Sequence, residues 1–531
     1  MSRLPEVAFP GLDRLGATSS AATPRPRRDW PGHVGIINDY VRIPYANGSS
    51  FASQFLYRNF VQRGHKVTVI GPHDPDAREA ELPRHHVCLP SLPMRNHPGL
   101  YLPMPTPQGI SAVERLDLDV ALGQCGSELA DLGVWLRWRQ NVPYMCVNTI
   151  HLPKVYNVLL PDQLMANQAV VKLFEERIIP YIERHSAKVY NQTDGLIVLS
   201  RGLKQYWRDR GVTAPIHVIP RAVDPTIFDR SAGEDPFPAA AKRGGRLLCV
   251  CRQTREKGIM RLLDIFARHI APVTPDATLT LVGDGPDFDN FVARTEELGV
   301  ADRVFFMGEH RLTDIPRFYR HADLFLFTSL SETYGQVVSE AMWCGLPVVA
   351  LDDGMGVAQQ IESGVDGVLV APGPDEHKAN WRFAKEVFTL MRDPQRRMAL
   401  STTAERRVRL RADPAICIDR YYDAFEQARD NCQADEENRR RTPFSHIKSI
   451  GRWTSIHSIL VTLGLLRPPA TINRHGRSQP GWEGAAKPAT AKDAEMAARV
   501  VAKAVEAFDH VPASATLSQF AAAYRLVSSA P

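Results

Sequence analysis

The sequence lacks any apolar segment long enough to cross a membrane. None of its apolar runs reaches the roughly 18–20 residues of a transmembrane helix. The N-terminus also lacks the apolar core of a signal peptide, and residues 1–30 are instead rich in Ser, Ala, Pro and Arg. We expect this range to be a flexible leader; a transit peptide is the alternative, and Glu6 and Asp13 count against it. A cytoplasmic protein is therefore expected.

Patterns typical of metal and dinucleotide sites are absent as well. The eight cysteines show no CxxC or Cys/His metal spacing, so we expect reduced thiols. Cys249 and Cys251 are predicted to point to opposite faces of a strand. The turn "VGDGP" (282–286) is not the GxGxxG of a dinucleotide site, which argues against a dehydrogenase. Asp352–Asp353 is not a DxD metal motif and is interpreted as structural, so no metal or other cofactor is expected.

The length and composition indicate a globular protein with more than one core. A chain of 531 residues is too long for one ordinary domain, so we expect two sizeable cores and tails. The apolar share of 44% and the charged share of 23% are those of a soluble globular protein. The net charge of +5 is modest for this length, and no nucleic-acid partner is expected.

From residue 34 onward, short apolar runs alternate with longer amphipathic segments. In the first half, buried strands are predicted at 34–39, 66–72, 144–150, 195–200 and 216–220. After a Pro/Gly-rich break, strands are predicted at 246–251, 278–285, 303–309, 324–329, 346–354 and 366–373. This alternation predicts the α/β class, with two doubly wound, Rossmann-like sheets facing a cleft. The predicted ranges are 1–30 for the leader, 31–235 and 242–430 for the two domains, and 431–531 for a tail.

Polar residues gather where predicted strands of the second half end. The segments are "CRQTREKG" with Arg252 and Lys257, "VGDGP" with Gly283, "SLSETYG" with Glu332, and "LDDGMG". Each segment alone is a weak signal, because a Gly-Asp-Gly-Pro stretch is most often only a turn. Glu332 and Glu340 also have an alternative interpretation as acids near the N-terminus of a surface helix.

The order of these segments, "VCRQTREKG…LVGDGP…FFMGEH…ADLFLFTSLSETYGQVVSEAMWCGLPVVA", resembles the nucleotide-sugar half of the family 4 glycosyltransferases. This is a retaining group with the GT-B fold, and the resemblance covers residues 34–430. It implies that Glu332 holds the donor sugar and Glu340 the ribose hydroxyls. It also implies that Arg252 and Lys257 neutralise the leaving diphosphate, so that no metal is needed. The other donor-binding positions it implies are Gly283, Thr333, Tyr334 and Gly335, where a helix begins and presents free N–H groups to an anion.

Two features of the first half extend the resemblance. Asn47 and Gly48 lie where the family places a glycine loop beside the donor phosphates, and they resemble the "P-x-x-N-G" subgroup that glycosylates diacylglycerol and related lipids. His151 in "VNTIHLPKVY" matches the family's "T-x-H" segment and is a candidate catalytic residue. The alternatives are an ordinary turn at Asn47–Gly48 and a structural histidine at position 151.

The tail combines basic and apolar residues. Between 438 and 482 it has no acid, while arginines and lysines accumulate. At helical spacing, residues 452, 456, 459, 460 and 463 form one face that is too short to span a bilayer but long enough to lie in its interface. The alternative is that this helix packs against the protein. We expect a peripheral enzyme on the inner face of the plasma membrane, attracted by anionic lipids.

The sequence therefore predicts a retaining glycosyltransferase. Its donor is expected to be a nucleoside diphosphate sugar, with UDP-sugar favoured, and its acceptor a membrane lipid such as diacylglycerol. One alternative is a GDP-mannose-dependent transferase that builds a polysaccharide or a phosphoinositol mannoside. Another is a non-catalytic protein that only binds a nucleotide sugar, because fold alone does not give activity.

Overall fold

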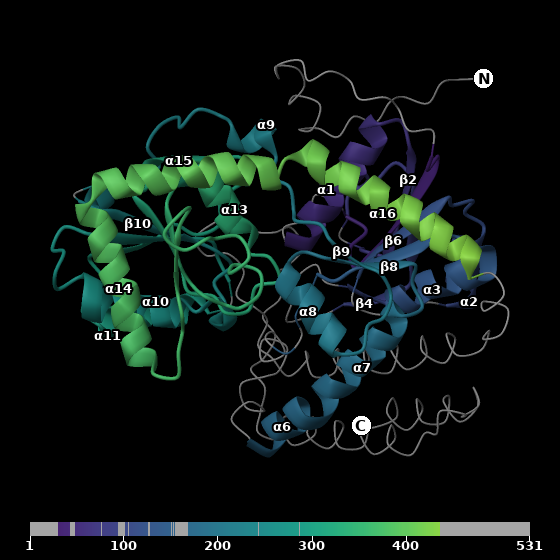
Figure 1. Ribbon diagram of the computed structural model, residues 1–531, viewed down its shortest axis with the longest axis horizontal. Helices are drawn as coiled ribbons and strands as arrows, with labels where there is room; N and C mark the ends of the chain where they lie inside the picture. Colours follow the sequence, from purple (N-terminus) through teal and green to yellow (C-terminus); the bar gives the residue numbers. More distant parts are fainter. Residues whose placement is uncertain are drawn as a thin grey trace.

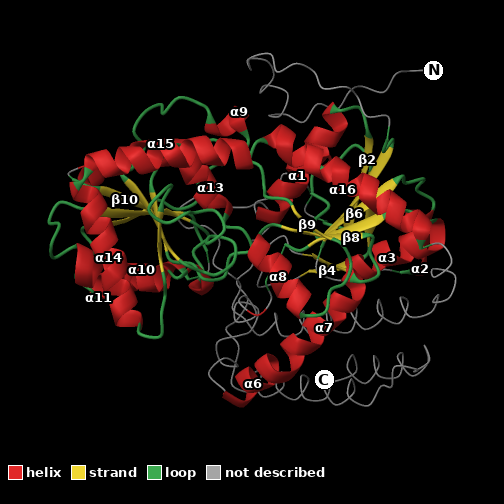
Figure 2. Cartoon of the chain, in the orientation of Figure 1, coloured by secondary structure: helices red, strands yellow, loops and turns green. Residues whose placement is uncertain are grey.

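The computed structural model describes residues 30–42, 48–75, 77–93, 101–104, 106–125, 128–149, 151, 153, 168–242, 244–285 and 287–435. Asn47 and the membrane-facing segment expected in the tail lie outside these residues. Figure 1 shows two α/β units side by side, and Figure 2 shows the strands of each unit gathered into one sheet between helices. The two doubly wound parallel sheets confirm the fold class predicted from the alternation of strands and helices.

The first sheet has seven parallel strands in the order β3-β2-β1-β6-β7-β8-β9. The strands are β1 (His33–Asn38), β2 (Lys66–Pro72), β3 (His86–Leu89), β6 (Val120–Gln124), β7 (Tyr144–Val147), β8 (Gly195–Val198) and β9 (Ile216–Val218). A separate antiparallel pair joins β4 (Ser91–Pro93) and β5 (Tyr101–Pro103). The helices are α1 (Gly48–Gln62), α2 (Pro107–Glu114), α3 (Glu128–Gln140), α6 (Gln168–Leu173), α7 (Ile179–Tyr190), α8 (Arg201–Asp209) and α9 (Pro225–Phe228).

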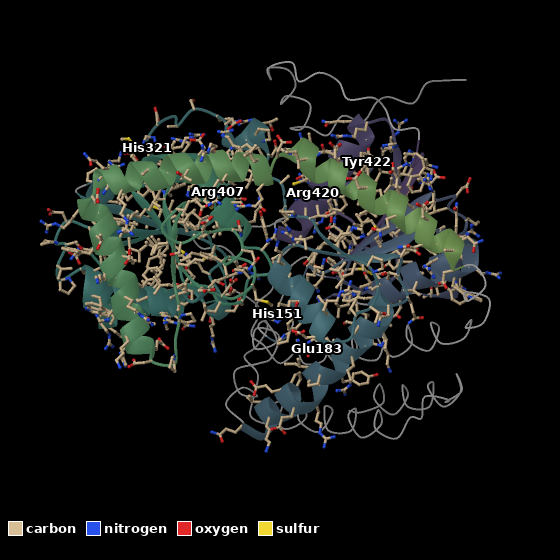
Figure 3. All side chains as sticks on the ribbon, viewed as in Figure 1. His151, Glu183, His321, Arg407, Arg420 and Tyr422 are labelled. Atoms are coloured by element: carbon tan, nitrogen blue, oxygen red, sulfur yellow. The ribbon has the colours of Figure 1, made fainter. Side chains whose placement is uncertain are left out.

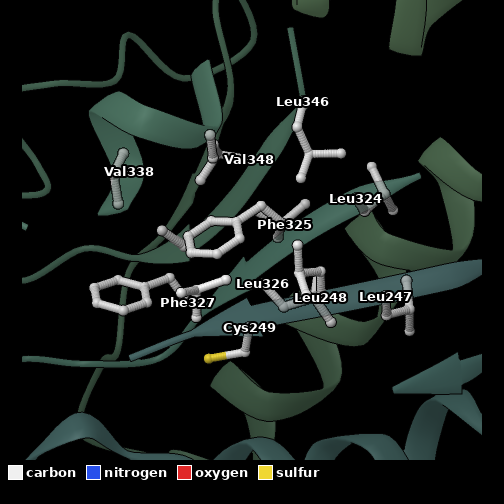
Figure 4. Close-up of a cluster of buried hydrophobic side chains, with 14 of the residues drawn as sticks. Leu247, Leu248, Cys249, Leu324, Phe325, Leu326, Phe327, Val338, Leu346 and Val348 are labelled. Carbon is white, nitrogen blue, oxygen red and sulfur yellow. The ribbon is translucent and has the colours of Figure 1, made fainter. Parts of the chain in front are cut away.

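The second sheet has six parallel strands in the order β12-β11-β10-β13-β14-β15. The strands are β10 (Arg246–Val250), β11 (Thr278–Val282), β12 (Val304–Phe306), β13 (Leu324–Phe327), β14 (Val348–Leu351) and β15 (Val368–Val370). The helices are α10 (Ile259–Ile265), α11 (Phe288–Glu297), α12 (Ile315–His321), α13 (Gln336–Trp343), α14 (Glu376–Arg392), α15 (Pro394–Arg411) and α16 (Pro414–Ala434). β10 and β13 form the centre of its core, where Leu248 and Phe325 are fully buried (Figure 4). Strands that are covered by helices on both faces need apolar side chains on both faces. This explains why their sequences are continuous apolar runs and do not alternate between apolar and polar residues.

The last three helices share one start signal that redirects the chain. Asp375, Asp393 and Asp413 each cap a helix by accepting a backbone N–H three residues on, at 2.9–3.1 Å. A proline follows Asp413 at the first helical position, so α15 cannot continue and a new helix begins. α16 then runs away from the second sheet and lies over the first (Figure 1).

α16 packs into the first core, away from its sequence neighbours. Its buried face belongs to the same cluster as the strands of the first sheet, and the Phe425 ring lies 5.7 Å from that of Phe60. His65 Nε2 and the Tyr422 hydroxyl are 2.7 Å apart. Residues 223–241 do the opposite, because Val223, Phe228 and Phe237 pack in the second core. Residues 223–241 thus pack with the second core, and α16 packs with the first.

One sequence expectation about the second sheet is wrong. Cys249 and Cys251 were expected on opposite faces, yet their sulfurs lie 3.8 Å apart. Side chains alternate along a strand, so residues two apart share a face. All eight cysteines, including this pair, are free thiols.

We predict that α16 stabilises the first unit through its buried aromatic face. Phe425→Ala should lower the free energy of unfolding by about 3–5 kcal/mol, because the cavity left beside Phe60 cannot collapse fully. Urea denaturation followed by far-UV circular dichroism measures this loss. Gln427→Ala, at an exposed position of the same helix, is the control and should change stability by less than about 0.5 kcal/mol. Equal effects of the two substitutions would contradict the docking of α16.

Candidate functional site

The candidate site lies at the carboxyl edge of the second sheet, between β10 and β13. The strand order reverses there, and this is where open parallel sheets bind ligands. The loops converge closely because glycines stand at the contacts. A Cβ on Gly283 would lie 2.0 Å from the Cys251 carbonyl oxygen, and one on Gly258 2.5 Å from that of Thr328. Both glycines also have positive φ, of 126° and 70°, which other residues rarely adopt.

An ion pair links the two loops of this edge. Lys257 Nζ lies 2.6 Å from Glu332 Oε1, and the Ser329 hydroxyl donates to the same oxygen at 2.7 Å. Burial alone would raise the pKa of Glu332, but the Lys257 ammonium and the hydrogen bonds outweigh it and lower the pKa. Burial opposes the charge of Lys257 as well, and Glu332 outweighs it and raises the lysine pKa. Both groups are therefore charged at neutral pH.

The second acid has a different environment. Glu340 is buried on α13, and the Tyr319 hydroxyl donates to its Oε2 at 3.2 Å. Burial raises the pKa of Glu340 to about 7, against the lowering effects of Tyr319, Gln336 and Arg221. The surface-helix interpretation of this acid is therefore wrong. A carboxylate that ionises near neutral pH can accept hydrogen bonds from ligand hydroxyls with strength that depends on pH.

The segment between the two acids connects the two sheets. The Thr333 hydroxyl donates to the Thr149 carbonyl oxygen, just past β7, at 3.3 Å. The Tyr334 ring is buried and belongs to the core of the first sheet. Gly335 has a φ of 77° and is the N-cap of α13; it makes no side-chain cap bond, and the N–H groups of a first helical turn suit an anion. A ligand held at this helix start therefore lies next to the first sheet.

The loop after β14 supports this segment. The Asp353 carboxylate accepts the N–H groups of residues 355–358 at 2.9–3.1 Å, so it has the structural role assigned to it. A Cβ on Gly356 would lie 2.6 Å from the Tyr334 nitrogen, so the loop packs directly under the site. Among the described residues, no group of three or more His, Cys, Asp or Glu side chains is arranged to hold a metal ion.

The remaining predicted residues occupy varied positions. Arg252 is exposed in the loop after β10, the same loop that leads to Lys257. Gly48 is the first residue of α1, directly after the undescribed Asn47. His151 lies near the centre of the molecule in Figure 3; it is buried, and its ring makes an edge contact with Tyr206 of α8 at 4.7 Å. Thr149, two residues before His151, contacts the loop that carries Glu332 and Thr333. His151 therefore lies just past this contact in the chain.

The sequence did not single out the polar residues at the carboxyl edge of the first sheet. Asn38 ends β1, Gln124 ends β6 and Asn148 follows β7, and all three are buried. β6 itself was not predicted, because "VALGQ" contains little of the β-branched and aromatic content that marks a strand. Arg221, which the pattern also left unassigned, faces Glu332, Glu340, Tyr334 and Tyr421, and burial lowers its pKa.

Two family models match consecutive parts of the chain. "Glycosyltransferase Family 4" matches residues 46–227, and "Glycosyl transferases group 1" matches residues 234–407. The chain is 23% identical over 328 residues to alpha-monoglucosyldiacylglycerol synthase of Streptococcus pneumoniae, covering 60% of this chain and 70% of that protein. It is 30% identical over 297 residues to D-inositol 3-phosphate glycosyltransferase of Rhodococcus jostii, covering 51% of this chain and 59% of that protein.

A solved structure shares the fold. The Anabaena protein HepE in complex with UDP superposes with a TM-score of 0.57 at 18% identity, over 74% of this chain and 99% of that one. Its two-sheet arrangement agrees with the GT-B architecture described above. With the two family models on consecutive segments, 46–227 and 234–407, the comparisons show that this chain belongs to the family 4 glycosyltransferases, enzymes with the GT-B fold.

Proposed function

We propose that the enzyme transfers a sugar from a nucleoside diphosphate sugar, with UDP-sugar as the favoured donor, to a membrane lipid such as diacylglycerol, with retention of anomeric configuration. The observation that carries the donor half is the Lys257–Glu332 pair, 2.6 Å long, beside the start of α13. An ammonium, a carboxylate and free helix N–H groups together suit a sugar diphosphate. The name of the streptococcal relative supports the lipid half.

The chemistry assigns separate tasks to the charged groups. The Lys257 ammonium has three N–H donors, and one of them is directed at Glu332. The others, with Arg252, can neutralise charge that grows on the diphosphate as the bond to the sugar breaks. Glu332, kept ionised by Lys257, can accept from the hydroxyls of the donor sugar. Glu340 and His151 are proposed to bind the ribose and the reacting sugar.

The direct test is release of nucleoside diphosphate from UDP- and GDP-sugars with lipid and soluble acceptors. Turnover of a UDP-sugar with a lipid supports the proposal. A preference for GDP-mannose would favour the polysaccharide or mannoside alternative. Binding of the sugar nucleotide without turnover across all acceptors would favour a non-catalytic protein.

We predict that Lys257→Ala lowers turnover more than donor affinity. The lost cation acts mainly on charge that develops as the diphosphate leaves, so kcat should fall by about 100-fold or more. Steady-state kinetics and calorimetric titration of the donor separate the two effects. Lys378→Ala, at an exposed site on α14, is the control and should change neither. An equal loss of affinity and turnover would assign Lys257 to ground-state binding.

We predict that donor affinity depends on pH through Glu340. Its folded pKa of about 7 lies above that of an exposed glutamate, so the ionised form prevails only above pH 7. Affinity for UDP should therefore rise between pH 6 and pH 8, and Glu340→Gln should remove this rise and weaken binding. Calorimetry at several pH values measures both.

The raised pKa of Glu340 also predicts that stability falls as pH increases, whereas donor affinity rises. The folded state binds the Glu340 proton more tightly than the unfolded state, so this group destabilises the fold as pH rises from about 4.5 to 7. Glu340→Gln should therefore raise the melting temperature more at pH 8 than at pH 5. An unchanged pH profile of binding and melting would remove the assignment of Glu340.

We predict that the tail attaches the enzyme to membranes. Among the described residues, none of the helices combines the length and apolar character needed to cross a bilayer. Deleting residues 438–531 should reduce cosedimentation with anionic liposomes and leave donor binding intact. Ile456→Asp, on the predicted apolar face, should weaken liposome binding more than Thr454→Asp on the opposite face. If the full-length protein ignores anionic liposomes at low salt, the membrane claim fails and a soluble acceptor replaces the lipid.

A further inference from the structure

Two buried carboxamides meet at the point of the first sheet where its strand order reverses. β1 and β6 are neighbours there, and Asn38 and Gln124 are paired residues at their carboxyl ends. Their side chains are 0% and 1% exposed, respectively. Strands of a parallel sheet lie about 4.8 Å apart, which is close enough for one small group to touch both side chains. This is the position in an open sheet where ligands bind.

Each carboxamide is held by one hydrogen bond. Asn38 Nδ2 donates to the Tyr40 carbonyl oxygen at 2.8 Å, and the Ser53 hydroxyl of α1 donates to Gln124 Oε1 at 3.4 Å. Asn38 Oδ1 and Gln124 Nε2 have no hydrogen-bond partner among the described residues. One atom is an acceptor and the other a donor. A single hydroxyl group can satisfy both, because it donates one hydrogen bond and accepts another. A carboxylate or phosphate oxygen can satisfy only the N–H.

Charged groups at the same edge point to an uncharged ligand. Arg42, four residues past β1, is almost fully buried, with Nε 2.5 Å from Asp74 Oδ2 and Nη1 3.4 Å from Glu81 Oε2. Glu81 also pairs with Arg78, so the two guanidinium groups and the two carboxylates of this cluster balance each other within the protein. An anionic ligand would therefore find no unneutralised guanidinium in this cluster to bind it.

The edge lies next to the loop that carries Glu332 and Thr333. β7 is the strand beside β6, and Thr149, just past its end, accepts the hydrogen bond from Thr333. Thr333 is adjacent to Glu332. The carboxyl ends of β7, β6 and β1 therefore form a polar row that starts at the donor loop and leads to Asn38 and Gln124.

We propose that Asn38 and Gln124 bind a hydroxyl group of the acceptor. The acceptor is then an uncharged alcohol, and phosphorylated or carboxylated acceptors are excluded. This inference rests on the proposed function and adds the acceptor side to it. Asn38 and Gln124 set acceptor specificity, and the Arg42–Asp74–Glu81 cluster removes the cation that an anionic acceptor requires.

The test compares acceptors and variants of the full-length enzyme. With UDP-glucose as donor, diacylglycerol in mixed micelles should be used and D-inositol 3-phosphate should not. Asn38→Leu and Gln124→Met replace each amide with an apolar group of similar size. Each should raise the acceptor KM about tenfold or more, because one hydrogen bond to the hydroxyl is lost, while donor KM and melting temperature stay close to wild type.

A matched control comes from the second sheet. Thr280 in β11 is fully buried, and its hydroxyl also has no hydrogen-bond partner among the described residues. Thr280→Val should leave the acceptor KM unchanged. A gain of function is expected from Asp74→Asn with Glu81→Gln, which leaves Arg42 unneutralised and should raise the rate with D-inositol 3-phosphate relative to diacylglycerol.

The outcomes separate this proposal from the function on which it rests. Better use of D-inositol 3-phosphate than of diacylglycerol overturns the uncharged acceptor while leaving a glycosyltransferase. An acceptor KM unchanged in Asn38→Leu and Gln124→Met means that the two amides bind only a buried water, and this also overturns the proposal. Absence of nucleoside diphosphate release with every acceptor and donor overturns the proposed function itself, and this inference with it.

Discussion

The chain passes between its two sheets twice, and a backbone hydrogen bond ties the two crossing segments together. The Val223 N–H donates to the Ala412 carbonyl oxygen at 3.0 Å, where the chain passes to the second sheet and where it returns. The two crossings therefore lie side by side. Gln336, the first residue of α13, adds a hydrogen bond to the Ala222 carbonyl oxygen at 3.1 Å. Because α13 is tied to the crossing, its position relative to the first sheet follows from this junction.

Burial raises the pKa of both Glu332 and Glu340, but the net shifts of the two acids differ because their partners differ. Glu332 has a lysine at 2.6 Å, which lowers its pKa despite burial, whereas burial of Glu340 outweighs the Tyr319 hydroxyl at 3.2 Å, Gln336 and the more remote Arg221. One carboxylate is thus charged at neutral pH and held by its partners, and the other ionises near neutral pH. The protein itself provides hydrogen-bond donors to Glu332. A ligand with hydroxyl groups can provide such donors to Glu340.

The sequence predicted the elements that rest on local chemistry. Apolar runs gave most strands, and the loops around Lys257 and Glu332 were placed correctly at strand ends, where the structure joins them in an ion pair. Long-range packing was beyond the sequence signal. Nothing local shows that Phe425 packs against Phe60, or that Tyr334, between two donor-side residues, belongs to the first core. Those contacts depend on how the chain returns after Asp413.

The missing prediction of β6 has a physical cause in the residue beside it. The Tyr144 ring of β7 is fully buried, and a Cβ on Gly123 of β6 would lie 2.2 Å from its hydroxyl oxygen. A Cβ on Gly133 of α3 would lie 2.0 Å from the same ring. The tyrosine therefore occupies the space that side chains at positions 123 and 133 would otherwise fill, and β6 needs a glycine at position 123. Gly123, which weakens the strand propensity of β6, is thus what lets this strand pass between β1 and β7 and place Gln124 at the carboxyl edge of the first sheet beside Asn38.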